Sequence, residues 1–393
     1  MGHFLVRTDF RGGNAIICDV AEGPERVRVD FAADPRNCPE ALWFDFRAEG
    51  LRGRELTCRL LNAEQTLGGE DWSGNHPVYR GDAGDWLRCP SPAEELSPSG
   101  RRSFAYTVPA GFETVEFAHC YPYQPEDLEK TLEAASVWQG EVLGYSHRGR
   151  PLWRYVSNFE RPAGPSADGR PAGHPGDPRP GFCLLARQHA GETPGSWVLD
   201  GLLRHLAEDD SARAAALWWV VPFVNIDDVV EGSYGKDPFP CDCNRAWHTI
   251  PLRTETKLLQ ADIARWTKCC RPCFLIDLHA PGHGERETYV HLPREGRSGR
   301  EYALVLDFAR RLRDAIPSEL RGEKWWERPT YPSRFTLGST VTSWFYDTYA
   351  LPGAGVETSY QGTATRDYTI TDYGRLGQAL AASLTQLARE CPP

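Results

Sequence analysis

The spacing of apolar residues changes near residue 125 of this 393-residue chain, and this change restricts the possible folds more than any other feature. Before it, four short segments alternate apolar and polar residues: 27–31, 42–46, 56–60 and 115–119. A period of two is typical of strands with one buried face. We therefore predict that residues 1–122 form an antiparallel β-sandwich. The stretch 63–103 is rich in Gly, Pro, Ser and Asp and is expected to form long loops.

Residues 123–393 are predicted to form an α/β domain with a mostly parallel, mixed sheet flanked by helices. Three largely apolar runs are typical of strands buried on both faces: 182–186, 217–224 and 273–278. A helix is expected between the first two runs, with Thr193 as its N-cap and Pro194 at its first position. Another helix is expected over 375–389. The Pro- and Gly-rich stretch 158–180 is typical of either an interdomain linker or a surface loop.

Charge and composition exclude several classes of protein. The chain has 44 Lys and Arg against 54 Asp and Glu, a net charge of −10, whereas nonspecific nucleic-acid binding needs a basic face. No apolar run approaches the ~18 residues of a membrane-spanning helix. Charged residues interrupt the N-terminus almost at once, unlike a secretory signal. We therefore expect a cytoplasmic protein with no nucleic-acid or membrane partner, and with most of its 12 cysteines reduced.

Three residues at strand ends form a candidate metal site. His189 and Glu192 follow the run 182–186, and His279 ends the run that starts at 273. The carboxyl ends of parallel strands share one edge of a sheet, where ligands bind in α/β folds. Two histidines and one glutamate with an open fourth position are typical of catalytic zinc. We expect one Zn²⁺ per chain at this edge, although either histidine alone would be read as an ordinary polar residue.

Further polar residues could complete a site. Asp242 could accept a hydrogen bond from a ligand histidine, as carboxylates around metal sites commonly do. Arg245 offers a planar fork for a carboxylate, and Asn244 adds a donor beside it. Glu357 lies in a short apolar strand and could act as general base. Each of these also has a simpler interpretation as part of a structural ion pair.

Taken in order, these motifs resemble those of the M14 zinc carboxypeptidases, and of the cytosolic carboxypeptidase-like branch in particular. The segments that carry the resemblance are 143–152 (LGYSHRGRPL), 186–193 (ARQHAGET), 222–228 (PFVNIDD), 242–247 (DCNRAW), 277–279 (DLH) and Glu357. The resemblance implies a β-sandwich before a catalytic domain over 123–393. It also places the 158–180 stretch inside that domain, as a surface loop.

The resemblance implies a function: hydrolysis of the C-terminal amide bond of peptides or proteins. His189, Glu192 and His279 would bind zinc, and Glu357 would act as general base toward the water that zinc activates. Asn244 and Arg245 would hold the terminal carboxylate of the substrate.

The chain departs from the family at two places. Gly235 falls where the family carries an arginine that stabilises the oxyanion, so that Lys236, or Arg187 from elsewhere, would have to supply the charge. Thr342 falls where the branch carries an arginine that reads an acidic residue, so a small or neutral C-terminal residue is at least as well suited. Tyr331 is a candidate for the mobile tyrosine over the pocket.

Three alternatives stay open. The chain could be a related zinc amidohydrolase acting on a cell-wall peptide or a small acylated amino acid, or a binding protein that retains the fold without catalysis. The cysteines could also form a second, structural zinc site, or be ordinary reduced thiols: Cys241, Cys243, Cys270 and Cys273.

Overall fold

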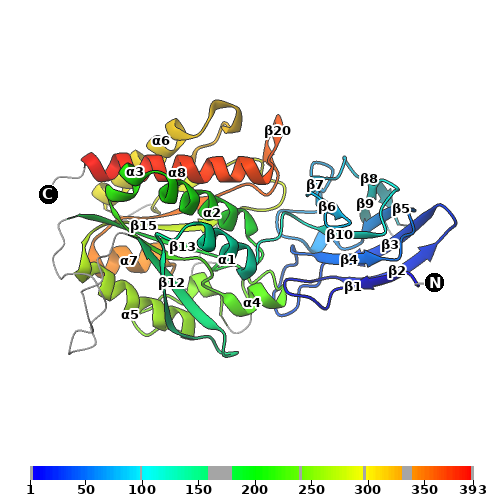
Figure 1. The fold of residues 1–393 in the computed structure, drawn as a ribbon, viewed down its shortest axis with the longest axis horizontal. Helices are drawn as coiled ribbons and strands as arrows, with labels where there is room; N and C mark the ends of the chain where they lie inside the picture. Colours follow the sequence, from blue (N-terminus) through cyan, green and yellow to red (C-terminus); the bar gives the residue numbers. More distant parts are fainter. Residues whose placement is uncertain are drawn as a thin grey trace.

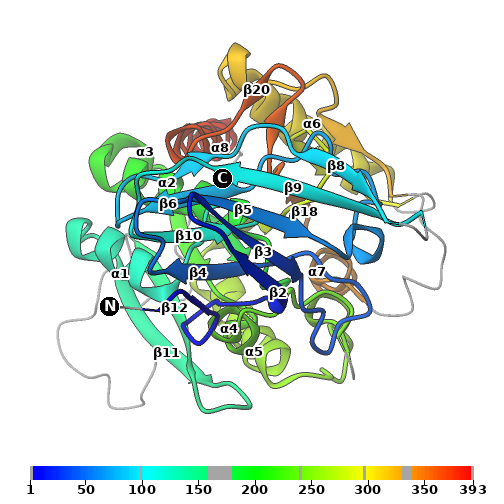
Figure 2. The ribbon, with the colours of Figure 1, turned by 90° about the vertical axis from the view of Figure 1, so that its right-hand side faces the viewer.

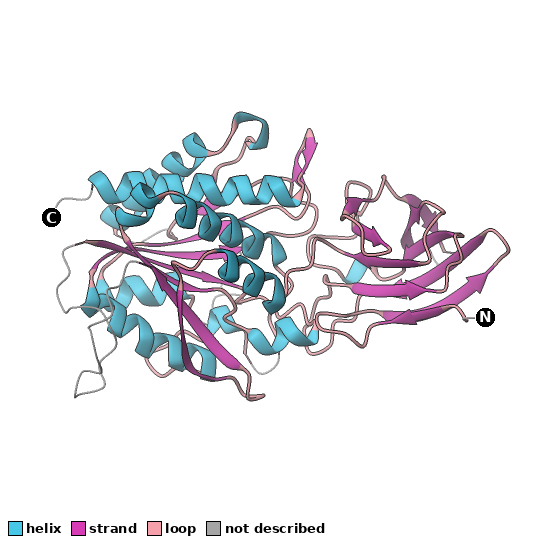
Figure 3. Cartoon of the chain, viewed as in Figure 1, coloured by secondary structure: helices cyan, strands magenta, loops and turns pink. Residues whose placement is uncertain are grey.

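The structure, a computed structural model, describes residues 3–97, 100–157, 179–238, 241–294, 298–329 and 339–390. The chain has an all-β N-terminal part that lies against a larger α/β part (Figure 1). Figure 3 shows the same division by secondary structure, with mostly strands on one side and a sheet flanked by helices on the other. The predicted fold class is confirmed.

The N-terminal part consists of two five-stranded sheets packed face to face. One has the order β1 (Leu5–Arg7), β4 (Asp45–Glu49), β10 (Thr114–Ala118), β6 (Val78–Gly81), β7 (Leu87–Arg88). The other has the order β2 (Ile16–Glu22), β3 (Arg26–Ala32), β5 (Glu55–Leu60), β9 (Arg102–Val108), β8 (Ala93–Leu96). All neighbours are antiparallel except β3 and β5, which are parallel. Aromatic rings of Phe31, Phe44 and Phe117 pack between the sheets with centroids 5.0 to 5.9 Å apart.

The prediction of long loops over 63–103 was wrong in part. This stretch contains β6, β7, β8 and a short 3-10 turn, η1 (Ala63–Gln65). Its strands have two to four residues, and β8 is exposed along its whole length. Strands this short show no alternation, so the periodicity on which the prediction rests is missing.

The α/β part is built on an eight-stranded mixed sheet. The strand order is β11 (Gln139–Tyr145), β12 (Pro151–Ser157), β14 (Leu217–Val221), β13 (Pro180–Ala186), β15 (Arg271–His279), β18 (Gly353–Glu357), β16 (Tyr289–His291), β17 (Trp326–Glu327). The four central strands are parallel and almost fully buried, which explains their largely apolar runs. Of the predicted loop 158–180, residues 158–178 lie outside the described ranges, and Pro180 begins β13.

Helices cover both faces of this sheet (Figure 2). One layer contains α1 (Pro125–Ala134), α2 (Thr193–Glu208), α3 (Asp210–Ala214), α6 (Gly299–Ala315) and α8 (Ile370–Glu390). The other contains α4 (Ile226–Glu231), α5 (Thr254–Cys269) and α7 (Val341–Tyr349). Shorter elements complete the part: η2 (Cys243–Arg245), η3 (Ser318–Leu320), β19 (Gly362–Thr363) and β20 (Arg366–Asp367). In the described part of the chain, no helix combines the length and apolar character needed to cross a bilayer.

Helix α2 begins one residue earlier than predicted. Glu192, not Thr193, is the N-cap residue, and Thr193 and Pro194 are the first two helical residues. The Glu192 side chain makes no capping hydrogen bond. Its two oxygens instead contact two histidines, His189 and His279, so this carboxylate serves the candidate site rather than the helix.

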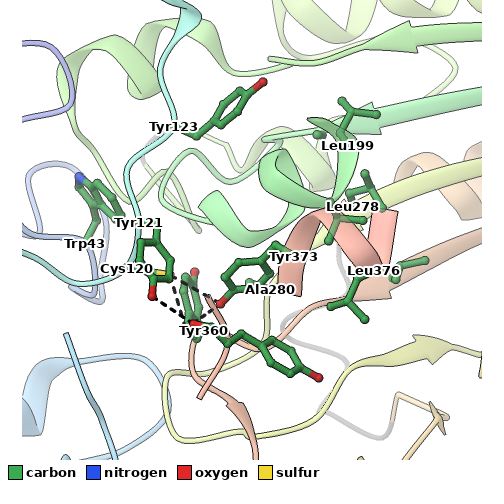
Figure 4. Close-up of a cluster of buried hydrophobic side chains, with 14 of the residues drawn as sticks. Trp43, Cys120, Tyr121, Tyr123, Leu199, Leu278, Ala280, Tyr360, Tyr373 and Leu376 are labelled. Carbon is green, nitrogen blue, oxygen red and sulfur yellow. Dashed lines mark hydrogen bonds between the residues drawn. The ribbon is translucent and has the colours of Figure 1, made fainter. Parts of the chain in front are cut away.

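The two parts share one continuous core. Figure 4 shows buried side chains at their junction, where Cys120 and Tyr121 lie beside Tyr360 and Tyr373. Polar contacts reinforce the packing: Asn14 Nδ2 donates to Gly232 O at 2.7 Å, and Tyr121 Oη donates to Tyr368 O at 3.2 Å. The β-sandwich therefore braces the loops that follow the central strands.

Candidate active site

The chain brings three strand ends together at one edge of the mixed sheet. β13 leads into the loop that carries His189, His279 is the last residue of β15, and Glu357 is the last residue of β18. His279 and Glu357 are direct neighbours in the parallel register of β15 and β18. This carboxyl edge is the usual place for ligands in α/β sheets.

His189, Glu192 and His279 form a compact set of metal-ligand atoms. One ligand atom from each residue lies within 4.8 Å of the others, and all three residues are buried. Glu192 Oε1 lies 2.7 Å from His189 Nδ1, and Glu192 Oε2 lies 2.7 Å from His279 Nδ1. Both imidazoles thus direct the same nitrogen, Nδ1, toward the shared carboxylate. This donor set fits a divalent ion such as zinc, which takes nitrogen and oxygen ligands.

The opposite nitrogen of each imidazole faces a second carboxylate. His189 Nε2 lies 3.2 Å from Asp242 Oδ2, and His279 Nε2 lies 2.7 Å from Asp277 Oδ2. Such outer carboxylates fix the ring orientation and leave Nδ1 available as a ligand atom. Asp242 lies where the sequence analysis placed it, whereas the role of Asp277 was missed. Its position two residues before His279 in one strand, and so on the same face, was the available signal.

Charges within this cluster shift the pKa values of its members in opposite directions. Burial opposes charge on His279, but Asp277 and Glu192 raise its pKa well above the ordinary value. Burial likewise opposes charge on Glu192, yet both histidines hold the pKa of this carboxyl far below its usual range. The pKa of Asp242 is lowered in the same way by His189. Three carboxylates thus surround two imidazoles, an arrangement in which a bound cation would replace protons.

Glu357 lies in the same cavity with one partner. His291 Nε2 lies 3.0 Å from Glu357 Oε1, while Glu357 Oε2 is buried and has no hydrogen-bond partner among the described residues. Burial tends to raise the pKa of Glu357, but the hydrogen bond and charge of His291 lower it overall. His291 was missed because β16 is only three residues long, too short for a periodic signal.

A cavity of about 130 Å³ contains most of the predicted site residues. Its lining includes the two histidine ligands, Glu357 and four of the predicted substrate-binding or charge-supplying residues: Lys236, Asn244, Arg245 and Thr342. Lys236 Nζ lies 3.8 Å from Glu192 Oε1. Thr342, at the start of α7, shares a 3.1 Å hydrogen bond with Thr340.

Asn244 is held by neighbours on both sides of its amide. Its Nδ2 donates to Asp277 Oδ2 at 3.1 Å and lies 3.0 Å from His279 Nε2. Its Oδ1 accepts from the backbone N–H of Val341 at 3.1 Å. Asn244 therefore links Asp277, the carboxylate beside His279, to the start of α7.

The structure explains why Gly235 stands in place of an arginine. Gly235 has φ of +75°, and a Cβ there would lie 2.8 Å from the backbone nitrogen of Ala190, inside the loop that carries His189. A side chain at 235 would displace this loop that carries His189, which we call the metal loop. The adjacent Lys236 is thus the cation that this loop brings toward Glu192.

Arg187 does not supply the missing charge. Its guanidinium is buried and donates to Ala190 O at 2.6 Å, Tyr123 O at 2.9 Å and Ser196 Oγ at 3.1 Å. Burial lowers its pKa to about 10. Arg187 therefore fixes the shape of the metal loop, and the expectation that it could move to the oxyanion was wrong.

Two other expectations concern the alternative cysteine zinc site and Tyr331. His189, Glu192 and His279 are the only cluster of metal-ligating side chains in the described ranges, and these ranges include all four cysteines of the alternative zinc site. Among the described residues, Cys241, Cys243, Cys270 and Cys273 form neither a disulfide nor a metal-ligand cluster. Tyr331 lies outside the described residues.

Comparison with known proteins finds carboxypeptidases among the similar sequences and structures. A family model described as the cytosolic carboxypeptidase N-terminal domain matches residues 6–119. Cytosolic carboxypeptidase 2 of Danio rerio is 28% identical over 238 residues, 55% of this chain and 30% of that protein. Cytosolic carboxypeptidase 6 of Caenorhabditis elegans is 28% identical over 261 residues, 63% of this chain and 55% of that protein. The chain thus spans less than two thirds of these relatives.

Solved structures share the fold over nearly the whole chain. A metallo-carboxypeptidase from Burkholderia cenocepacia matches with a TM-score of 0.79 and 19% identity, covering 98% of this chain and 99% of that one. A metallo-carboxypeptidase from Pseudomonas aeruginosa, solved with (2-guanidinoethylmercapto)succinic acid, matches with a TM-score of 0.75 and 24% identity, with 98% and 99% covered. These matches support a similarity of the chain to the cytosolic carboxypeptidase-like branch of the M14 metallocarboxypeptidases, and the solved structures share its fold.

Proposed function

We propose that this protein is a zinc-dependent metallocarboxypeptidase that hydrolyses the C-terminal amide bond of peptides or proteins. One observation carries the proposal: the ligand atoms of His189, Glu192 and His279 converge beside the Glu357 carboxylate in one cavity. Arg245 lines the same cavity and offers a partner for a terminal carboxylate. A metal site, a base and a carboxylate-binding group are the parts this reaction needs.

The three ligand residues would hold one zinc ion. A bound zinc ion would lower the pKa of water and polarise the scissile carbonyl. Asp242 and Asp277 would keep both imidazoles oriented with Nδ1 toward the ion.

Glu357 would be the general base. Its lowered pKa keeps the carboxyl ionised at neutral pH, so it can take a proton from the attacking water at its open oxygen, Oε2. It would then return this proton to the leaving amine. Lys236 would supply positive charge near the developing oxyanion, as a point charge rather than a fork.

The remaining cavity residues would select the substrate. Arg245, assisted by Asn244, would bind the terminal carboxylate. Thr342 offers a neutral hydroxyl where a cation would be needed to read an acidic side chain, so a small or neutral C-terminal residue fits best. We further assign 1–122 to the sandwich domain and 123–393 to the catalytic domain, and, following the cytosolic relatives, a cytoplasmic location.

A Glu357→Gln variant tests the proposed chemistry. It removes the base but keeps the shape, so it should retain one zinc per chain while peptide hydrolysis falls by at least ~10². Glu133→Gln, at an exposed position on α1, is the matched control and should keep full activity. Full activity in Glu357→Gln would contradict the role of this residue.

The second candidate is a zinc amidohydrolase acting on a cell-wall peptide or a small acylated amino acid. The glycine at 235 and the threonine at 342 favour it, because both depart from the pattern of the branch. A substrate without a free α-carboxylate would not need Arg245. Arg245→Ala should therefore raise KM strongly for a carboxypeptidase and be nearly silent for an alternative substrate that has no free α-carboxylate.

A further inference from the structure

His291 reaches the proposed base from a neighbouring strand. β16 runs antiparallel to β18, and His291 pairs with Gly355, two residues before Glu357. Residues two apart in a strand point to the same face, so His291, Gly355 and Glu357 share one face of the sheet. Gly355 has no side chain, and a Cβ there would lie 3.6 Å from His291 Cδ2. The ring therefore lies beside Gly355 and contacts the next side chain on that face, Glu357.

This contact distinguishes the two oxygens of Glu357. Oε1 lies 3.0 Å from His291 Nε2, and Oε2 has no hydrogen-bond partner in the described part of the chain. A carboxylate can rotate about its terminal torsion, which has a broad, roughly two-fold preference. A hydrogen bond to one oxygen removes this freedom and determines which oxygen stays open toward the cavity.

His291 is itself held in place. The ring of Tyr289 packs edge-on against it, with centroids 5.4 Å apart and an interplanar angle of 90°. Lys236, the cation that lies beside the metal ligands in this cavity, contacts Glu192 rather than Glu357. Among the residues that the structure describes, His291 is the one hydrogen-bond donor to the Glu357 carboxylate.

We propose that His291 is the positioning residue of the general base: its Nε2–H binds Glu357 Oε1 and leaves Oε2 to accept the proton of the attacking water. This inference rests on the proposed function. His291 acts through Glu357, because its Nε2 contacts this carboxylate at 3.0 Å. It should therefore affect the rate of the chemical step more than substrate binding.

Two substitutions separate the hydrogen bond from ring packing. His291→Phe keeps a ring in place but has no donor, whereas His291→Gln loses the ring but keeps an N–H donor. Hydrogen bonds to charged groups are strong enough that we expect kcat to fall roughly 10- to 100-fold in His291→Phe, with KM within about twofold. His291→Gln should recover to within about threefold of the wild-type kcat. His147→Phe, at an exposed position, is the control and should match the wild type.

The readouts are kcat and KM on the peptide that the wild type cleaves best, with zinc per chain and melting temperature for every variant. A wild-type kcat in His291→Phe would overturn the inference. So would equal losses in both variants, or a raised KM with unchanged kcat, which would make His291 a substrate contact. In each of these outcomes, peptide hydrolysis by the wild type would still support the proposed function. A zinc-loaded wild type without activity would refute both.

Discussion

Two buried carboxylates, Asp242 and Asp277, determine how the histidine ligands of this site are presented. Each lies within 3.2 Å of an Nε2 atom and so keeps Nδ1 of the same ring available. Asp277 also accepts from Gln188 Nε2 at 2.6 Å and from Asn244 Nδ2 at 3.1 Å. At the scale of single residues, the affinity of this site for a metal ion would therefore depend on side chains outside the ligand set.

Asp277→Asn should weaken zinc binding without removing a ligand. Loss of the carboxylate charge makes His279 a poorer ligand, and such changes typically cost roughly 10- to 100-fold in affinity. Competition with a chelator measures the effect. The exposed Asp314→Asn on α6 is the control. Unchanged affinity in Asp277→Asn would show that the 2.7 Å contact with His279 is dispensable.

His119, in the shared core, makes stability depend on pH. The ring is fully buried among Phe44, Trp72 and Tyr360, and neither nitrogen has a hydrogen-bond partner among the described residues. Burial lowers the pKa of His119 well below its ordinary 6.5. Below about pH 6.5 the unfolded chain takes up a proton that the folded chain does not, so stability falls as the pH falls.

His119→Phe should remove this dependence and keep the packing. Between the two pKa values, each such histidine contributes about 1.4 kcal/mol per pH unit to the slope of the unfolding free energy. In His119→Phe, the slope of the unfolding free energy against pH, measured by denaturant unfolding between pH 7 and pH 5, should be smaller than in the wild type by about this amount. His283, whose pKa burial lowers to about 4, would account for part of the remaining slope. An unchanged slope would mean that His119 is not buried in its neutral form.

Sequence patterns could predict the candidate metal ligands and one partner, Asp242, but not the other partners of the site. His189, Glu192 and His279 follow buried strands, and strand ends can be read from apolar runs. The contact between His291 and Glu357 depends on the antiparallel pairing of β16 with β18, two strands far apart in sequence, and no local pattern encodes that pairing. Asp277 belongs to a motif that the sequence analysis singled out, yet its contact with His279 became evident only with the strand in place.

At the scale of elements, the loop between α4 and η2 shapes the site. It carries Lys236 to the cavity and packs Gly235 against Ala190. Only a residue without a side chain fits there, and the positive φ of Gly235 adds a second reason for glycine. The departure from the family at this position is therefore a packing property of the loop.

Gly235→Ala should both strain the backbone and displace the metal loop. Gly53→Ala is a matched control, because Gly53 has φ of +74° but a Cβ there would meet nothing within 4 Å. We expect Gly53→Ala to cost about 1 kcal/mol of stability, and Gly235→Ala to cost about 1–3 kcal/mol more and to reduce zinc affinity. Equal effects in unfolding and zinc titrations would show that the contact with Ala190 does not matter.

Element boundaries followed the sequence where burial was periodic. The stripe of Leu199, Leu202, Leu203 and Leu206 on α2 has the spacing of one helix face and is buried. The predicted N-cap of α2 was one residue too late. Glu192 occupies that position, and its carboxylate contacts the two histidines rather than the N–H groups at the helix end. The strand expected over 42–46 begins only at Asp45, because the residues before it, including Trp43, are buried at the junction rather than paired in a sheet.

At the scale of the whole molecule, the β-sandwich supports the structure of the α/β part. Trp43 donates from Nε1 to Gly12 O at 2.8 Å, and its Cβ lies 3.1 Å from the position that a Cβ on Gly191, next to Glu192, would take. Asn14 and Arg36 bind the backbone of the loop around Gly232. Removal of residues 1–122 would expose this core, so deletion is expected to unfold the chain rather than to change its substrate range.

Trp43→Ala tests this bracing in the intact chain. Loss of a buried tryptophan typically costs about 3–5 kcal/mol, and the metal loop would lose its support. We expect a lower unfolding free energy together with weaker zinc binding. Trp153→Ala, at a position with 40% exposure, is the control and should change both properties little. Loss of stability with normal zinc affinity would indicate that the sandwich supports the fold but not the site.

The central claim is that this site removes single residues from peptide C-termini with the help of zinc. The most direct measurement is mass spectrometry of a mixed peptide pool incubated with zinc-loaded protein, with and without a chelator. We predict shortening by one residue at a time from the C-terminus, stopped by the chelator, with small or neutral residues released first. An unchanged peptide pool, with one zinc bound per chain, would contradict the claim.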